Sequence, residues 1–158
     1  MSQKRGVKLA TVYTTQDFGL GEEYKSPEGN VYVFMQADGA VTLNKFYVYD
    51  QTTWQITDLL DLAVNPADTK TQPVCVPQVT LADNEYTWVV VGPHNGFTGT
   101  AAEDIDALDV VYLHATAGAV GDTASLGFLP MVSPAAAILS GATGTFVANA
   151  RMYAWDLP

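Results

Sequence analysis

The sequence is poor in cysteine and in charge, and poorest in positive charge. One cysteine, Cys75, among 158 residues excludes an intrachain disulfide and a metal site built from cysteines. Charged residues make up 15% of the chain, against about 25% in a typical soluble domain. The chain has seven lysines and arginines and 17 aspartates and glutamates, which gives a formal net charge of −10. Because nucleic-acid binding needs cations that neutralise phosphates, we do not expect this acidic body to bind DNA or RNA.

Long apolar runs and helical patterns are also lacking. The longest apolar stretches fall short of the roughly 18 residues of a membrane-spanning helix, and the N-terminus has no apolar signal-peptide core. What is present is 48% hydrophobic residues, arranged in short β-like segments at a spacing of about 8–12 residues with Gly, Pro and Asn between them. The sequence predicts an all-β fold: a single compact β-barrel or β-sandwich domain over residues 7–158, preceded by a flexible arm over residues 1–6.

The expected β segments alternate with turns along the whole chain. We expect turns at 26–29, 38–39 and 93–96, where Pro, Gly, Asp and Asn supply the special backbone angles, and one helical turn within 57–68. The expected β segments are residues 6–14, 30–36, 45–50, 53–57, 74–81, 85–92, 108–116, 125–132, 135–140 and 145–155.

Several of these strands are apolar on both faces. In 30–36, Tyr32 and Phe34 alternate with Val31, Val33 and Met35. Two arrangements account for this pattern: a small closed barrel whose outside is covered by loops, or a sheet face that packs on another subunit. The sequence does not separate them.

Residues that could carry catalysis or bind a metal are few. His94 and His114 lie 20 residues apart without a metal-binding spacing, so we interpret them as surface or hydrogen-bonded histidines. Cys75 stands between two valines and is typical of a small buried hydrophobe. No catalytic residue, metal ligand or cofactor is therefore assigned.

An acidic cluster could in principle bind calcium. It places four carboxylates within seven residues, and calcium prefers such oxygen ligands, but the EF-hand pattern is missing. We favour a solvated acidic loop and leave calcium binding open. The cluster consists of Glu103, Asp104, Asp106 and Asp109.

A group of aromatic residues allows a second interpretation. Tyr47, Tyr49 and Trp54, together with Trp88, could form an exposed contact surface or a stacking platform for sugars. Aromatic residues at alternating strand positions are also typical of a core, and the composition does not distinguish the two.

Residues 88–120 carry a recognisable pattern. The strand and turn from Trp88 to Pro93, the segment from Ile105 to Tyr112 and the ATAGAV segment at 115–120 follow one another in this order. This block resembles small β-rich head decoration (cement) proteins of tailed bacteriophages. Residues 31–50 resemble the opening segment of the same family more loosely, and the aromatic stretch YVYDQTTWQI (47–56) departs from the family's pattern.

The resemblance implies a role rather than a chemistry. It implies a non-enzymatic virion protein that is made in the host cytoplasm, binds the major capsid protein on the outer surface of the head and reinforces the shell. Its expected partners also include neighbouring copies of itself, in a homo-oligomer such as a trimer, but neither nucleic acid nor a membrane. A carbohydrate-binding or receptor-binding tail-fibre module is the alternative, and a small hydrolase with a histidine beside a carboxylate is a second rival.

The positive charges of the N-terminal arm are the expected capsid contact. Lys4, Arg5 and Lys8 are three of the seven positive residues and lie within the first eight positions. They could attract a negative surface of a capsid or decoration subunit, on which the arm would become ordered. A solvated tail is the alternative reading.

Overall fold

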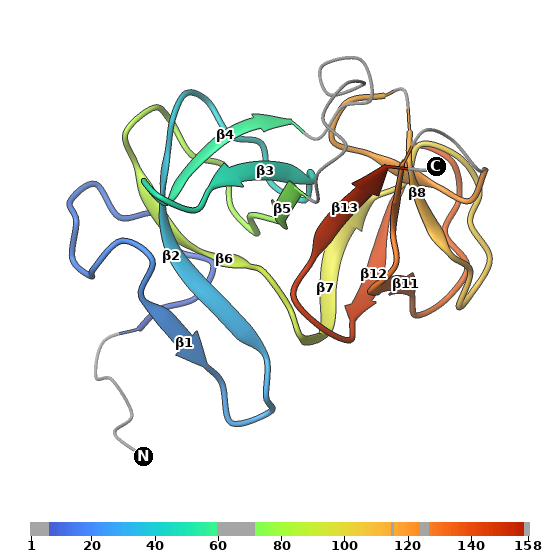
Figure 1. Ribbon diagram of the computed structural model, residues 1–158, viewed down its shortest axis with the longest axis horizontal. Coiled ribbons are helices and arrows are strands. Elements are labelled where there is room, and N and C mark those ends of the chain that lie inside the picture. Colours follow the sequence, from blue (N-terminus) through green and yellow to red (C-terminus); the bar gives the residue numbers. More distant parts are fainter. Residues whose placement is uncertain (1–6, 60–71, 115, 124–126, 157–158) are drawn as a thin grey trace.

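The computed structural model describes residues 7–59, 72–114, 116–123 and 127–156, which form strands, turns and loops. The all-β prediction is confirmed, and none of the described residues forms a helix that could cross a membrane. Figure 1 shows two neighbouring parts, here called the N-terminal half (residues 7–91) and the C-terminal half (residues 94–156). The strands are β1 (Glu23–Lys25), β2 (Val31–Ala37), β3 (Tyr47–Asp50), β4 (Gln55–Leu59), β5 (Gln72–Cys75), β6 (Tyr86–Val90), β7 (His94–Thr100), β8 (Val111–Leu113), β9 (Val120–Gly121), β10 (Gly127–Leu129), β11 (Val132–Pro134), β12 (Thr143–Ala148) and β13 (Tyr153–Asp156).

Two sheets hold these strands. The larger sheet has the order β1-β2-β4-β3-β5-β13-β10-β8-β9, with β6 on the other edge of β2, and the smaller sheet has the order β11-β12-β7. All strand pairs are antiparallel except β2 with β4, which pair in parallel at Gln36 with Gln55 and at Ala37 with Ile56. Because β5 pairs with β13, the larger sheet continues from the N-terminal half into the C-terminal half.

The turns predicted at 26–29 and 38–39 are formed in the structure. Gly29 has a φ of 87° and its N–H donates to the Ser26 carbonyl, which closes the 26–29 turn. Gly39, with a φ of 99°, closes the turn after β2. The β3–β4 connection is held by Asp50, whose carboxylate accepts the N–H groups of Thr52 and Thr53 at 2.6 and 3.2 Å. These bonds stabilise the charged form and lower the pKa of Asp50.

The strands that are apolar on both faces are buried on both faces within the chain. On one face of β2, Tyr32 and Phe34 join a core shared by the two halves, which also contains Trp88 of β6. On the other face, Val33 and Met35 join a second core made only of N-terminal-half residues. A second subunit is therefore not needed to explain the apolar pattern of β2 and β6.

The two halves meet where backbones approach closely. Gly92 has a φ of 75°, and a Cβ atom there would lie 2.2 Å from the Ala150 carbonyl oxygen, so the position requires glycine. Phe46 extends from the N-terminal half into the shared core, where its ring meets Phe97 and Phe146 edge-on at 6.2 and 5.8 Å between centroids. The contact between the halves is thus part of the core.

Two predicted elements are wrong. The predicted strand over 6–14 is not formed by its described residues, 7–14: Ala10 has a φ of 51°, and the Tyr13 hydroxyl bonds the backbone N–H and carbonyl of Lys8, so this segment turns. Only Tyr13 pairs with a strand, through a bridge to Tyr86.

The predicted turn at 93–96 is also wrong, because β7 begins at His94. The Asn95-Gly96 pair takes up a register shift between β7 and β12 instead of reversing the chain.

The remaining differences are shorter strands and new breaks. The predicted strand at 108–116 is reduced to β8, and 145–155 splits into β12 and β13 around 149–152. Residues 135–140 form only a bridge at Ile138 with Ile105. The predicted helical turn within 57–68 lies outside the described residues except for 57–59, which belong to β4.

Candidate functional site

His94 is a buried histidine with both ring nitrogens engaged. Its Nδ1 accepts the Gly96 N–H at 3.1 Å, so the neutral ring carries its proton on Nε2, which lies 2.8 Å from the Tyr32 hydroxyl. The side chain is 6% exposed, and burial lowers its pKa. His94 therefore joins β7 to β2 across the two halves as a structural group.

The other two candidates for chemistry are also held in place by the fold. His114 Nδ1 accepts the Thr116 N–H at 3.0 Å, the same local bond that His94 makes. Cys75 is fully buried in the core of the N-terminal half, and desolvation raises the pKa of its thiol. A thiol in such surroundings stays protonated and unreactive.

The acidic cluster connects loops. The two Glu103 carboxylate oxygens accept the Thr123 N–H and hydroxyl, each at 3.0 Å, and Asp104 accepts the Ser140 N–H at 2.7 Å. Asp106 is exposed. Over residues 7–59, 72–114, 116–123 and 127–156, no three His, Cys, Asp or Glu side chains gather in a way that could hold a metal ion. Glu103 and Asp104 thus tie the loop to residues 123 and 140 by hydrogen bonds.

The predicted aromatic contact surface is not exposed. Tyr47 and Tyr49 are each 3% exposed and Trp88 is 1% exposed, so these rings fill the cores. Trp54 is half-buried and stacks on Tyr49, with ring centroids 6.0 Å apart and an interplanar angle of 21°. Of the two interpretations that the sequence leaves open, burial therefore favours the core for Tyr47, Tyr49 and Trp88, and these three rings do not form an exposed stacking platform.

Of the three basic residues near the N-terminus, Lys8 belongs to the described residues. Lys8 is exposed, and its backbone is held by the Tyr13 hydroxyl. Lys4 and Arg5 lie outside the described residues. Their contact with a capsid stays a prediction.

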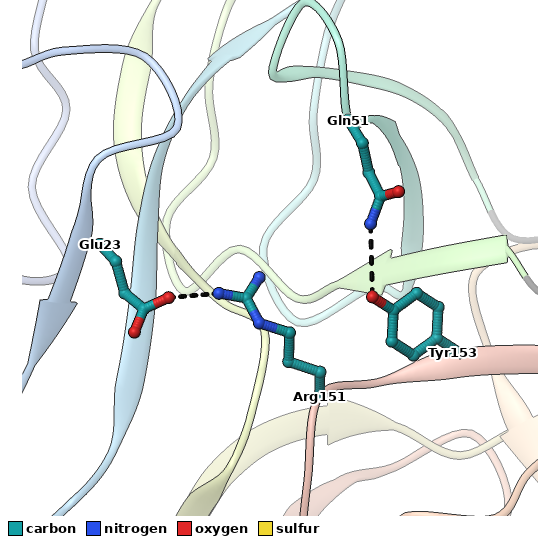
Figure 2. A network of polar contacts seen from close by, with 4 residues as sticks. All are labelled: Glu23, Gln51, Arg151 and Tyr153. Carbon is teal, nitrogen blue, oxygen red and sulfur yellow. Dashed lines mark hydrogen bonds and ion pairs between the residues drawn. The ribbon is translucent and has the colours of Figure 1, made fainter.

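Polar contacts join the two halves on the surface. Figure 2 shows Arg151, which lies just before β13, directed at the carboxylate of Glu23 on β1, with which it forms an ion pair. Beside this pair, the Gln51 amide donates to the Tyr153 hydroxyl at 3.3 Å. Gln78 adds two bonds to the Thr98 backbone, at 3.0 and 3.1 Å. These polar contacts add to the shared core in joining the two halves.

Sequence reasoning missed a group of exposed apolar side chains in the C-terminal half. Seven large hydrophobic residues of the described ranges are exposed, and the three most exposed are Leu108 at 78%, Leu139 at 72% and Val110 at 52%. All three lie in segments that the sequence predicts as strands, where an apolar residue is expected to face a core. The sequence signal for this exposure is adjacent pairs of apolar residues, such as Val110-Val111 and Ile138-Leu139. Because successive side chains of a strand point to opposite faces, only one member of each pair can face the core on that side.

The fold and these surfaces define the class: an all-β protein whose described polar groups serve mainly to join strands and loops. The chain matches no protein-family model and no curated protein. The structure of the chain is similar to that of the N base of head fiber gp8.5 from bacteriophage phi29, known from a crystal structure, with a TM-score of 0.53 and 15% sequence identity. The match covers 76% of this chain and 95% of the phage chain. At this identity the likeness establishes a shared fold.

Proposed function

We propose that this chain is a structural protein of a tailed-bacteriophage head. The observation that carries the proposal is the likeness to the head fiber base, which covers nearly the whole of that chain. A second, separate support is the resemblance of residues 88–120 to head decoration proteins, because it comes from sequence motifs and not from the fold. Both lines lead to small β-rich proteins of phage heads.

Within that class, we propose a decoration protein that binds the major capsid protein on the outer surface of the head and reinforces it. Two features support this role. The shared core and the contacts between the halves give a rigid body. The net charge of −10 keeps the protein away from the DNA that the head packages. We further propose that the chain is not an enzyme: Cys75 is buried, and His94 is hydrogen-bonded on both ring nitrogens.

Quantitative mass spectrometry of purified virions tests this function. We expect the chain in every particle, at a fixed and high copy number relative to the major capsid protein. Its absence from washed virions would overturn the proposal. A copy number near that of a tail component would contradict decoration and favour a tail-fibre module instead.

We propose that the N-terminal arm strengthens binding to the capsid. Deletion of residues 2–8 is expected to leave a folded protein that occupies undecorated heads more weakly at matched concentration. Replacement of Lys4, Arg5 and Lys8 by Gln is the matched variant, because it removes the charges and keeps the chain length. Equal occupancy by the deletion variant and the unmodified protein would contradict a contact through the arm.

A further inference from the structure

Two segments of the C-terminal half form an exposed ribbon. Residues 104–111 and 129–140 run antiparallel and are joined at three places along their length: Ile105 bridges Ile138, the Leu108 N–H donates to the Pro134 carbonyl at 3.0 Å, and Val111 pairs with Leu129. We call these segments the apolar ribbon. It includes β11 and the first residue of β8, and both strands lie toward the opposite end of the molecule's longest axis from β1 (Figure 1).

The ribbon carries most of the exposed apolar side chains. Leu108, Val110, Met131 and Leu139 are four of the seven large hydrophobic residues that are exposed in the described ranges. The alanines at 135–137 are also exposed, as are Asp104, Asp106 and Ser140, so the ribbon presents apolar and acidic side chains together. In contrast, the inward residues Ile105, Val111 and Ile138 are at most 5% exposed, so the ribbon is anchored on the core. Several exposed large apolar side chains on two paired segments are typical of an interaction site.

Leu108 is held outward by an unfavourable backbone. Its φ of 68° lies in the left-handed region, where Gly or Asn is better tolerated than a bulky side chain. Leu108 is also the most exposed large hydrophobic residue of the described ranges. Neither local conformation nor burial within the chain favours a leucine here.

Charge selects the kind of partner. Asp104, Asp106 and Asp109 lie along the ribbon, and no Lys or Arg occurs in the sequence between Lys70 and Arg151. Two copies of a chain with a net charge of −10 repel each other, and a symmetric contact through the ribbon would bring these carboxylates together. The complementary surface has an apolar centre and a rim of Lys and Arg.

We infer that the apolar ribbon is the docking surface for a different protein, one that presents an apolar recess rimmed by basic side chains. The inference rests on the proposed function, under which this partner is the outer surface of the major capsid protein. Leu108 and Leu139 are the central anchors, and the aspartates orient the encounter.

A binding titration of undecorated heads with purified full-length protein tests the inference. The test variant combines Leu108→Asn with Leu139→Gln. It removes two exposed leucines, and Asn suits the left-handed backbone at position 108, so the fold is expected to persist. The control is Leu43→Gln, which changes an exposed leucine of the N-terminal half, 42% exposed. Circular dichroism and the thermal midpoint of each variant verify folding.

We expect the control to bind like the unmodified protein and the double variant to bind at least about tenfold more weakly, since each buried leucine side chain is worth that much or more. Binding of the unmodified protein should also weaken with added salt. Equal binding by the folded double variant overturns the ribbon as the docking surface but leaves the proposed function standing. Failure of the unmodified protein to bind heads overturns the proposed function and this inference with it. If the unmodified protein is an oligomer in light scattering and the double variant a monomer, the occupant is a second copy and the inference is wrong.

Discussion

The two halves of the molecule bury their apolar side chains differently. The N-terminal half contributes to the shared core and also has a core of its own, built around Val33, Met35 and Ile56. In the C-terminal half, the buried hydrophobic residues other than Ala119 belong to the shared core. The same half leaves Leu108 and Leu139 more than 70% exposed. The C-terminal half therefore places its buried residues in a core that it shares with its neighbour, while it also exposes large apolar side chains to solvent.

This difference suggests a division of roles. The exposed leucines of the apolar ribbon belong to the C-terminal half. We therefore propose that this half makes the main contact with a partner, beside the contact proposed for the N-terminal arm.

Truncation of the shared core should destabilise both halves together. Phe46 is fully buried between Phe97 and Phe146, so Phe46→Ala is expected to cost about 3–5 kcal/mol. Unfolding in urea, followed by tryptophan fluorescence and by far-UV circular dichroism, should show one coincident transition at a lower midpoint. Two separate transitions, with only one of them shifted, would show that the halves are independent.

The close approach at the junction should make Gly92 far more sensitive than a comparable turn glycine. Gly29→Ala is the matched control, because Gly29 also has a positive φ but has no atoms within 4 Å of a Cβ position. The control is expected to lose about 1–2 kcal/mol from backbone strain alone. Gly92→Ala adds a clash with the Ala150 carbonyl, so it should lose at least about 1 kcal/mol more. Equal losses would mean that the two halves can separate slightly without cost.

Acid should destabilise the fold at His94, because the added proton goes to Nδ1, the atom that accepts the Gly96 N–H in the neutral form. Burial lowers the pKa of folded His94, so the unfolded chain binds more protons once the pH falls below about 6.5. The histidine's contribution to stability is therefore complete above that pH and is lost as the pH falls toward the folded pKa.

The measurement is the free energy of unfolding at about pH 7.5 and at about pH 5.5. His94→Gln, which does not titrate, should be about 1–3 kcal/mol less stable than the unmodified protein at the higher pH. The gap between the two proteins should narrow at the lower pH. A constant gap at both pH values would contradict a buried neutral histidine.

The surface ion pair between the halves should contribute least. Arg151 and Glu23 have side chains that are 35% and 48% exposed, so water and salt screen their attraction. A double-mutant cycle with Arg151→Ala and Glu23→Ala is expected to give a coupling of about 0.2–1 kcal/mol. A coupling above about 2 kcal/mol would show that this ion pair, and not only the shared core, contributes strongly to the contact between the halves.

The fold class and the two-sided strands could be predicted from the sequence, because alternation and turn residues are local signals. In β2 the assignment of Tyr32 and Phe34 to one face and Val33 and Met35 to the other is confirmed by the two cores. The alternation over residues 6–14 is regular, so the sequence predicts a strand there. The positive φ of Ala10, at which the segment turns, cannot be recognised from the sequence. Similarly, Asn95-Gly96 is a good turn signal, and only the pairing of β7 with β12 makes it a register shift.

The candidate site was less accessible to sequence reasoning. The aromatic residues Tyr47 and Tyr49 look the same in a sequence whether they face a partner or a core, and here they face a core. Conversely, Leu108 and Leu139 look like strand residues and are exposed. Which apolar residues remain uncovered depends on long-range packing such as the bridge between Ile105 and Ile138, and local patterns do not encode it.

Cryo-electron microscopy of purified virions would locate this chain on the particle. We expect density for this fold on the outer surface of the shell, seated on the major capsid protein through residues 104–111 and 129–140. Particles without such density on the head, or with the fold found in the tail, would contradict the claim that this chain decorates a phage head.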